Sequence, residues 1–325
     1  MGPLLAGRAG QKSRGSLLAS LLVFTVANLA TALSPTVGFF LVARVVAGAA
    51  AGVYSPLSSA VAAELVGQKR RGRAVALVLA GLAVGTVFGV PVGLALAQRC
   101  GWRAAMLLIV VIGGAALAGI ALRGGELPAI PASAPAARLR SITRPKNLLT
   151  VTVTLLTGVA SLGLYTYLAV VLSAGSLASH QNMAIWIWGL GGAVGALGIG
   201  RLVDRCDPLR LSAVILAVLA FALAGMTQNE IPGILVVSLF IWGLCGWASL
   251  APQQHVLLQA NPRDGATAVA ANASANYLGS ALGATIGSLL VAAHAAPTVL
   301  CGSASAVAVL ALLCQLVRQR MSSKA

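Results

Sequence analysis

A single arginine, Arg44, stands inside a long apolar stretch of the sequence. A guanidinium this far into a membrane span costs about 2.5–3.5 kcal/mol on insertion scales, so such residues usually serve a function. Arg44 is therefore predicted to bind an anionic group or to tune a nearby carboxylate. The alternative is that its side chain snorkels to the outer interface, about 10 Å away. Ser55 and Ser58 fall near the same helix face and are expected to line the same cavity, although small-residue packing explains them equally well.

Two more polar sets interrupt apolar stretches later in the chain. Thr150, Thr154 and Thr157 share one face of a predicted helix, and Asn272 and Asn276 are one turn apart on another. Asparagine side chains need partners in lipid, so they must face protein or water. We expect Thr154, Asn272 and Asn276 either to contact a substrate or to form hydrogen bonds between helices.

Tryptophans are the remaining side chains in these stretches that offer a binding surface. They are expected to anchor helices at the membrane interface, and the alternative is that they stack on an aromatic substrate. The residues concerned are Trp186, Trp188, Trp242 and Trp247.

The usual signatures of enzymes and cofactor sites are absent from the sequence. It has no phosphate-binding glycine loop with a lysine, no G-x-S-x-G and no H-E-x-x-H. The five cysteines are scattered and form no C-x-x-C, so we expect no metal, no cofactor and no enzymatic activity. The acidic residues all fall at the ends of apolar stretches or between them: Glu64, Glu126, Asp204, Asp207, Glu230 and Asp264.

The elements that must hold these side chains are membrane-spanning helices. The chain is 58% hydrophobic and only 9% charged, whereas soluble domains carry about 25% charged residues. A helix crosses the hydrocarbon core in about 20 residues. Windows of that length predict ten spans, at residues 15–33, 37–63, 74–97, 104–122, 148–172, 183–200, 209–226, 232–250, 266–292 and 298–317.

The basic residues predict how these spans are oriented. All of the 22 lysines and arginines except Arg44, Arg99 and Arg103 fall in loops on one side of the ten-span arrangement. The positive-inside rule then places both termini in the cytoplasm of a bacterium, with the chain in its inner membrane. The net charge of +16 therefore reflects topology, and nucleic acid is not an expected partner.

A proline- and arginine-containing segment divides the chain. Residues 126–145 hold four prolines and are predicted to form an extended cytoplasmic linker. The predicted organisation is an N-terminal half of four spans (1–122), a linker (123–147) and a C-terminal half of six spans (148–325).

Two related loop sequences point to a family. The segment from Pro3 to Lys12 resembles the pattern G-x-L-a-D-R-x-G-R-K in Arg8, Gly10 and Lys12, but Gly7 replaces the aspartate. A second copy follows at the same topological place in the later half, with Gly200, Asp204 and Arg205. The chain thus resembles the major facilitator superfamily, specifically its bacterial drug:proton antiporter branch, which includes chloramphenicol-resistance and sugar-efflux permeases.

Two motifs within spans carry the same resemblance. Arg44 with Gly48 and Gly52 matches the family's R-x-x-x-G-x-x-x-G. The third predicted span resembles the antiporter signature in its glycine spacing and its proline, with Gly81, Gly85, Gly89, Pro91 and Gly93.

The resemblance implies an all-α bundle that exports small, drug-like or sugar-like molecules in exchange for protons, by alternating access of its two halves. It implies that the loops at Arg8 and Asp204 gate the cytoplasmic side and that the helices of Thr154 and Asn272 line the cavity. The partners expected are lipid, a small substrate and protons, for a monomer.

The family usually has six helices in each half, so an arrangement of four plus six predicts that the first two helices are missing from this chain. A mis-called start or a truncated gene is the preferred explanation. In relatives an acidic residue on the first helix often carries the proton, and that helix is not here. The alternative function is therefore a non-transporting remnant, or a membrane protein that binds or regulates.

Overall fold

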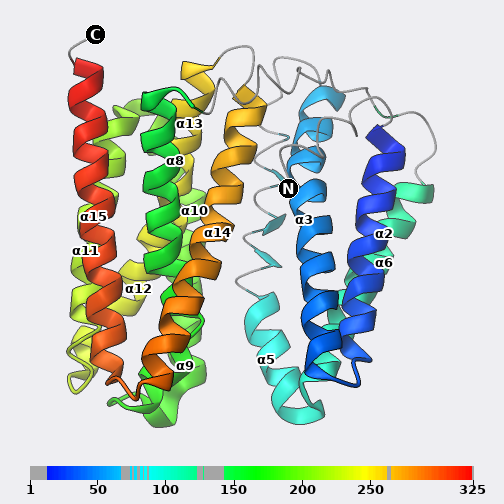
Figure 1. Cartoon of the computed structure of the whole chain (residues 1–325), viewed down its shortest axis with the longest axis horizontal. Helices are drawn as coiled ribbons and strands as arrows, with labels where there is room; N and C mark the ends of the chain where they lie inside the picture. Colours follow the sequence, from blue (N-terminus) through cyan, green and yellow to red (C-terminus); the bar gives the residue numbers. More distant parts are fainter. Residues whose placement is uncertain are drawn as a thin grey trace. The chain divides into compact units, whose positions relative to one another are not determined.

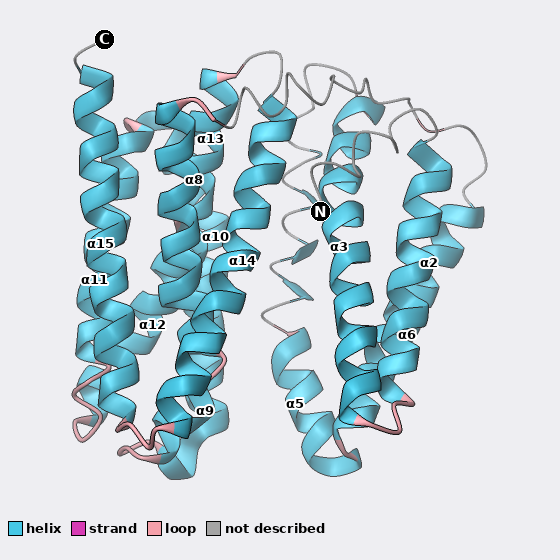
Figure 2. Cartoon of the chain, viewed as in Figure 1, coloured by secondary structure: helices cyan, strands magenta, loops and turns pink. Residues whose placement is uncertain are grey.

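The structure is a computed structural model that describes residues 13–66, 74, 77–78, 81–82, 84–85, 88–122, 127, 143–261 and 265–323. It divides into two compact units, Met1–Ala136 and Ala137–Ala325, and each is described by itself. The described segments are helices joined by short loops, and no strand occurs among them (Figure 2). This agrees with the all-α bundle that the sequence predicts.

Nine helical segments in the described part of the chain are long and apolar enough to cross a membrane. They correspond to nine of the ten predicted spans. The remaining span, 74–97, is described only in part, from helix α5 onward, so much of it lies outside the described residues. The nine segments are Arg14–Ala32, Val37–Ser55, Trp102–Leu122, Pro145–Gly163, Ala178–Val203, Pro208–Gly225, Pro232–Ala260, Ala268–Ala292 and Pro297–Ser322.

The first unit is built around its first described helix. Its helices are α2 (Ser13–Ala32), α3 (Val37–Leu65), α5 (Gly89–Cys100) and α6 (Trp102–Leu122), and α2 packs against both α3 and α6 (Figure 1). The chain turns from α5 into α6 at Gly101, where a φ of 82° favours glycine.

Next to this turn, Arg103 contacts the loop that follows α2. It donates a hydrogen bond to the Ser34 carbonyl at 3.3 Å, and its guanidinium lies over the Trp102 ring at 4.7 Å.

The second unit holds the remaining helices. They are α8 (Pro145–Thr157), the π-helical turn η3 (Gly158–Gly163), α9 (Leu168–Ser173), the 3₁₀ turn η4 (Ala178–His180), α10 (Gln181–Arg205), α11 (Pro208–Gly225), α12 (Pro232–Ala248), α13 (Leu250–Ala260), α14 (Gly265–Ala292) and α15 (Pro297–Ser323). Its packed pairs include α10 with α12, α11 with α15, and α8 and η3 with α14 (Figure 1).

Several of these helices start where the sequence provides a start signal. Proline is among the first residues of α8, α11 and α12, where its missing N–H costs nothing and its fixed φ suits the helix. Asp207 caps α11, because its carboxylate accepts from the backbone N–H groups of Leu209 and Arg210 at 2.8 and 3.0 Å.

The core of the second unit corrects the expectation for two tryptophans. Trp188 and Trp242 are buried at 2% and 0% exposure, and so they neither anchor at an interface nor present a free stacking surface. Tyr165 stacks on Trp188 with ring centroids 4.2 Å apart, and Trp242 donates from its indole N–H to the Ser161 hydroxyl at 2.9 Å. Packing between helices has overridden the tendency of tryptophan to sit at membrane interfaces.

Candidate functional site

The threonine face of α8 is buried within the second unit. Thr150, Thr154 and Thr157 are 0%, 1% and 4% exposed. The hydroxyls of Thr150 and Thr157 donate to backbone carbonyls one turn earlier, Lys146 at 3.0 Å and Val153 at 2.7 Å. The Thr154 hydroxyl is buried, and no described group forms a hydrogen bond with it.

The α14 face that meets these threonines carries Asn272 and Asn276, followed by Gly279 and Gly283. The two helices touch through their backbones. A methyl group added at Gly279 would collide with the Leu155 carbonyl, and one added at Gly158 would collide with the Asn276 carbonyl. Further along, Gly283 meets Val159 and Gly287 meets Tyr167. Residue numbers thus increase together along the two segments from Leu155 and Gly279 onward, so α8 with η3 runs parallel to α14.

Thr154 and Asn272 lie on the faces of α8 and α14 that meet. Gly158 meets Asn276, and one turn earlier on each parallel helix come Thr154 and Asn272. Asn272 is fully buried, and neither its amide nitrogen nor its amide oxygen has a hydrogen-bond partner among the described residues. We name Thr154, Asn272 and Asn276 the amide cluster.

A buried polar group without a hydrogen-bond partner lowers the stability of the fold. Leaving a buried donor or acceptor unpaired costs about 1–3 kcal/mol, and the amide cluster holds three such atoms, on Thr154 and Asn272. The expectation of hydrogen bonds between helices is therefore not met for Asn272, because glycine packing brings these helices together instead. The cluster offers a hydroxyl and an amide, able to donate and accept, to a ligand or to water.

The first unit holds a second polar site, at Arg44. Its guanidinium donates from Nη1 to the amide oxygen of Asn28 on α2, at 3.1 Å. Asn28 is fully buried and its own amide N–H donates to the Phe24 carbonyl at 2.8 Å. The Arg44 side chain is exposed. The described residues include no carboxylate that pairs with it, so its charge and its other N–H donors face outward from this contact.

Asn28 was not predicted as a functional residue. The signal was present, since an amide inside an apolar span needs a partner in the same way as Asn272. Asn28 holds one edge of the Arg44 guanidinium against α2, which restrains the snorkelling that the sequence allowed.

The contact between Asn28 and Arg44 can be tested by a double-mutant cycle. We expect Asn28→Ala to destabilise the protein by about 1–3 kcal/mol, because it removes the acceptor of a charged donor. Arg44→Ala and the double variant complete the cycle, read as thermal unfolding midpoints in detergent. A coupling energy of about 0.5–3 kcal/mol is expected, and strict additivity of the two single changes would contradict the contact.

The two serines predicted near Arg44 are not brought to it. Ser55 and Ser58 lie 11 and 14 residues further along α3, which is about 16 and 21 Å along the helix axis. The Ser58 hydroxyl donates to the Ser55 carbonyl at 2.8 Å. The structure therefore separates these serines from the guanidinium.

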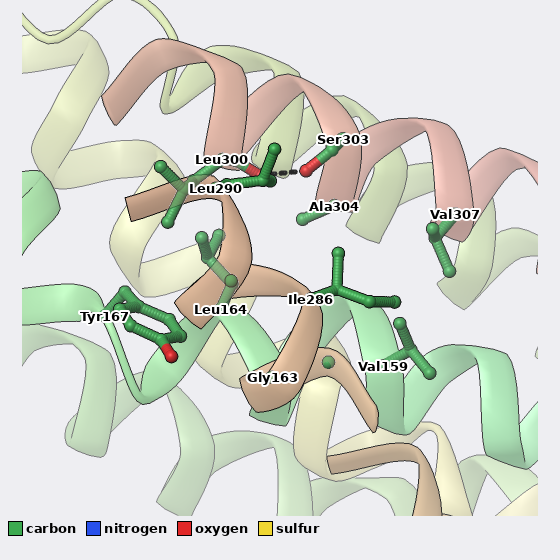
Figure 3. A pocket seen from close by; sticks show the side chains of 12 residues that line it. Val159, Gly163, Leu164, Tyr167, Ile286, Leu290, Leu300, Ser303, Ala304 and Val307 are labelled. Carbon is green, nitrogen blue, oxygen red and sulfur yellow. Dashed lines mark hydrogen bonds between the residues drawn. The ribbon is translucent and has the colours of Figure 1, made fainter. Parts of the chain in front are cut away.

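A small pocket lies beside the amide-cluster helices, at the junction of η3, α14 and α15 (Figure 3). Its volume is about 50 Å³, and its lining is mostly apolar, including Gly163, Ile286, Leu300 and Ala304. Tyr167 closes one side and donates to the Ala284 carbonyl at 2.6 Å. Ligand sites usually measure about 300–1,000 Å³, so this pocket is too small for a drug-sized substrate.

Comparison with known proteins identifies the family. The family model of the Major Facilitator Superfamily matches residues 1–284. The chain belongs to this superfamily. The resemblance to this superfamily drawn from its motifs is thereby confirmed, and the protein is a multi-pass membrane transporter.

Individual relatives agree with the family. The chain is 27% identical over 298 residues to the inner membrane transport protein YdhP of Escherichia coli K12, covering 90% of this chain and 76% of YdhP. It is 31% identical over 255 residues to a chloramphenicol resistance protein of Streptomyces lividans, covering 76% of this chain and 64% of that protein. Among solved structures, the human organic anion transporter MFSD10 superposes with a TM-score of 0.75 at 18% identity, covering 97% of this chain and 80% of MFSD10.

The two copies of the superfamily's loop motif are described to different extents. Arg8, Gly10 and Lys12 lie outside the described residues. In the second copy, Gly200 and Arg205 are exposed near the end of α10. Asp204 lies in the last turn of the same helix, and its side chain is outside the described residues.

The superfamily's glycine motifs make no close contact within the part of the chain that the structure describes. A methyl group added at Gly81, Gly85, Gly89 or Gly93 would meet no described atom within 4 Å, and the same holds for Gly48 and Gly52. Pro91 lies in the first turn of α5. Close approach of helices through glycine is seen within the second unit, at Gly279 and Gly283.

Proposed function

We propose that this transporter exports small, drug-like or sugar-like molecules in exchange for protons. The observation that carries the proposal is the amide cluster, in which Thr154 and Asn272 present buried polar atoms that the protein leaves unpaired. A transported solute with hydroxyl or amide groups can satisfy them. Chloramphenicol resistance, named for a relative 31% identical to this chain, fits a solute of this kind.

Alternating access supplies the mechanism. The predicted halves, residues 1–122 and 148–325 joined by the linker 123–147, rock against one another and expose their polar sites to each side in turn. Arg44, held by Asn28, binds an anionic group of the solute or a carboxylate that takes part in proton coupling. The helices of Asn272 and Thr154 form part of the path, and the loops at Arg8 and Asp204 gate it.

The membrane arrangement completes the proposal. The charge distribution of the loops favours the inner membrane of a bacterium with both termini in the cytoplasm, and YdhP is named as an inner membrane protein. A monomer suffices for this mechanism.

Transport can be measured in cells that lack their own efflux pumps. Expression of the full chain is expected to reduce accumulation of chloramphenicol or of another solute in a drug and sugar screen. A protonophore should abolish the difference, because the proton gradient is the proposed driving force.

Two variants sharpen this experiment. Arg44→Ala is expected to lower export, while Arg99→Ala, which removes an exposed charge at the end of α5, should leave it unchanged. The proposal fails if no solute in the screen is moved and Arg44→Ala has no effect.

A further inference from the structure

Basic residues gather at one end of the second unit, where α8 and α11 begin and α15 ends. We name this group the basic corner: Arg144, Lys146, Arg210, Arg318 and Arg320. Three membrane spans have their boundaries there, starting at Pro145 and Pro208 and ending at Ser322. Side chains at this depth lie at the level of the phospholipid phosphates.

Hydrogen bonds between the helices hold the corner together. Arg318 donates from Nε to the Lys146 carbonyl at 2.8 Å, which joins α15 to α8. Gln315 and Gln319 both donate to the Leu209 carbonyl, at 2.9 and 2.7 Å, which joins α15 to α11. The basic residues of the three helices therefore belong to one place in the fold.

Arg318 is the unusual member of the corner. It is only 4% exposed, and its Nη1 is buried with no hydrogen-bond partner in the described part of the chain. Its Nε also approaches the Thr150 hydroxyl, at a long 3.4 Å. A buried guanidinium is unfavourable unless it is paired with an opposite charge.

Acidic residues do little to balance this charge. Asp207 is at the corner in sequence, but its carboxylate caps α11 by accepting from the N–H groups of Leu209 and Arg210. Among the described side chains, no carboxylate forms an ion pair with Arg318. Arg144, Lys146, Arg210 and Arg318 thus form no ion pair with a described carboxylate.

Apolar surface continues from the corner toward the middle of the membrane. Leu313 and Val317 on α15 are 53% and 50% exposed, and Val214 on α11 is 60% exposed. A cationic corner above exposed aliphatic side chains matches the two ends of a phospholipid.

We infer that the basic corner binds the headgroup of an anionic phospholipid, with its acyl chains along α11 and α15. The phosphate supplies the negative charge that Arg144, Lys146, Arg210 and Arg318 lack, as anionic lipids do for basic pockets between membrane helices. This lipid site is separate from the amide cluster, so it does not depend on the proposed export function.

Native mass spectrometry of the purified full chain can test the lipid site. Wild type is expected to retain dioleoyl-phosphatidylglycerol in preference to dioleoyl-phosphatidylethanolamine, which has the same chains but no net charge. Arg144→Gln with Arg210→Gln should reduce the affinity for phosphatidylglycerol on the order of tenfold, because each basic residue near an anionic surface contributes measurably. Arg201→Gln with Arg205→Gln removes the same charge from exposed positions on α10 and should retain wild-type binding.

A second measurement distinguishes a role of Arg318 in lipid binding from a purely structural role. Arg318→Gln is expected to abolish the rise in thermal midpoint that phosphatidylglycerol gives to wild type, while Arg318→Lys retains part of it. Glycerol 3-phosphate should give no such rise, because it lacks the chains. Equal retention of both lipids by wild type, equal losses in the two double variants, or an undiminished lipid effect in Arg318→Gln would overturn the inference.

Discussion

Asn272→Ala is expected to lower the transport rate on the order of tenfold while leaving the thermal midpoint nearly unchanged. The amide makes no hydrogen bond to the described protein, so its removal deletes two unsatisfied buried atoms and offsets the loss of packing. A solute that uses the amide as donor and acceptor loses about 0.5–1.5 kcal/mol for each bond. The rate would be measured as uptake into everted vesicles.

Two further variants show whether such an effect belongs to the amide cluster. Ser274→Ala changes an exposed residue two positions away on the same helix, whose hydroxyl donates only to the Ala270 carbonyl, and should transport normally. Thr154→Val keeps the shape of the side chain and removes one unpaired hydroxyl, so a smaller loss of about threefold is expected. Normal transport by Asn272→Ala, or a large fall in its thermal midpoint, would mean that the amide is structural.

Gly279→Ala is expected to have the largest effect on stability. Its new methyl group would collide with the Leu155 carbonyl, and backbone cannot move aside as a flexible side chain can. Overpacking of this kind costs about 1–3 kcal/mol or more, and in this place it must push α14 away from α8. A lower thermal midpoint and a lower yield of monodisperse protein in detergent would report it.

The matched control for this change is Gly302→Ala on α15. A methyl group there meets no atom within 4 Å, and alanine is favoured over glycine inside a helix by about 1 kcal/mol. Gly302→Ala should therefore be neutral or slightly stabilising. If both variants behaved alike, the backbone contact between α8 and α14 would be wrong.

The sequence predicts the spans well, because each apolar run is long enough to cross a bilayer and must be helical there. It also predicts which polar residues stand out, including Arg44, Thr154 and Asn272. It does not predict their partners. Asn28 bonds Arg44 from 16 residues away on another helix, and although an amide stands out within an apolar span, the local pattern does not show which residue it pairs with.

The contrast between glycines shows why packing was harder to predict. Gly48 and Gly52 have the same spacing as Gly279 and Gly283, yet among the described residues the second pair touches another helix closely and the first pair does not. Spacing shows that a close approach is possible, and the neighbouring helix decides whether it occurs. Likewise, Trp188 and Trp242 are in the core because α10 and α12 pack together there.

The π-helical turn η3 has a consequence for how this helix tolerates changes in length. A π turn holds one more residue than an α turn, and one residue corresponds to a rotation of about 100°. Deleting one residue within 158–163 would convert the π turn into a regular α turn and leave the residues that follow, from Tyr165 to Leu172, in nearly their present orientation. Deleting one residue from the regular helix α8 would instead rotate them by about 100°, away from their present neighbours. Between the threonines of α8 and the tyrosines that follow, the π turn is therefore the place where the chain tolerates the loss of one residue.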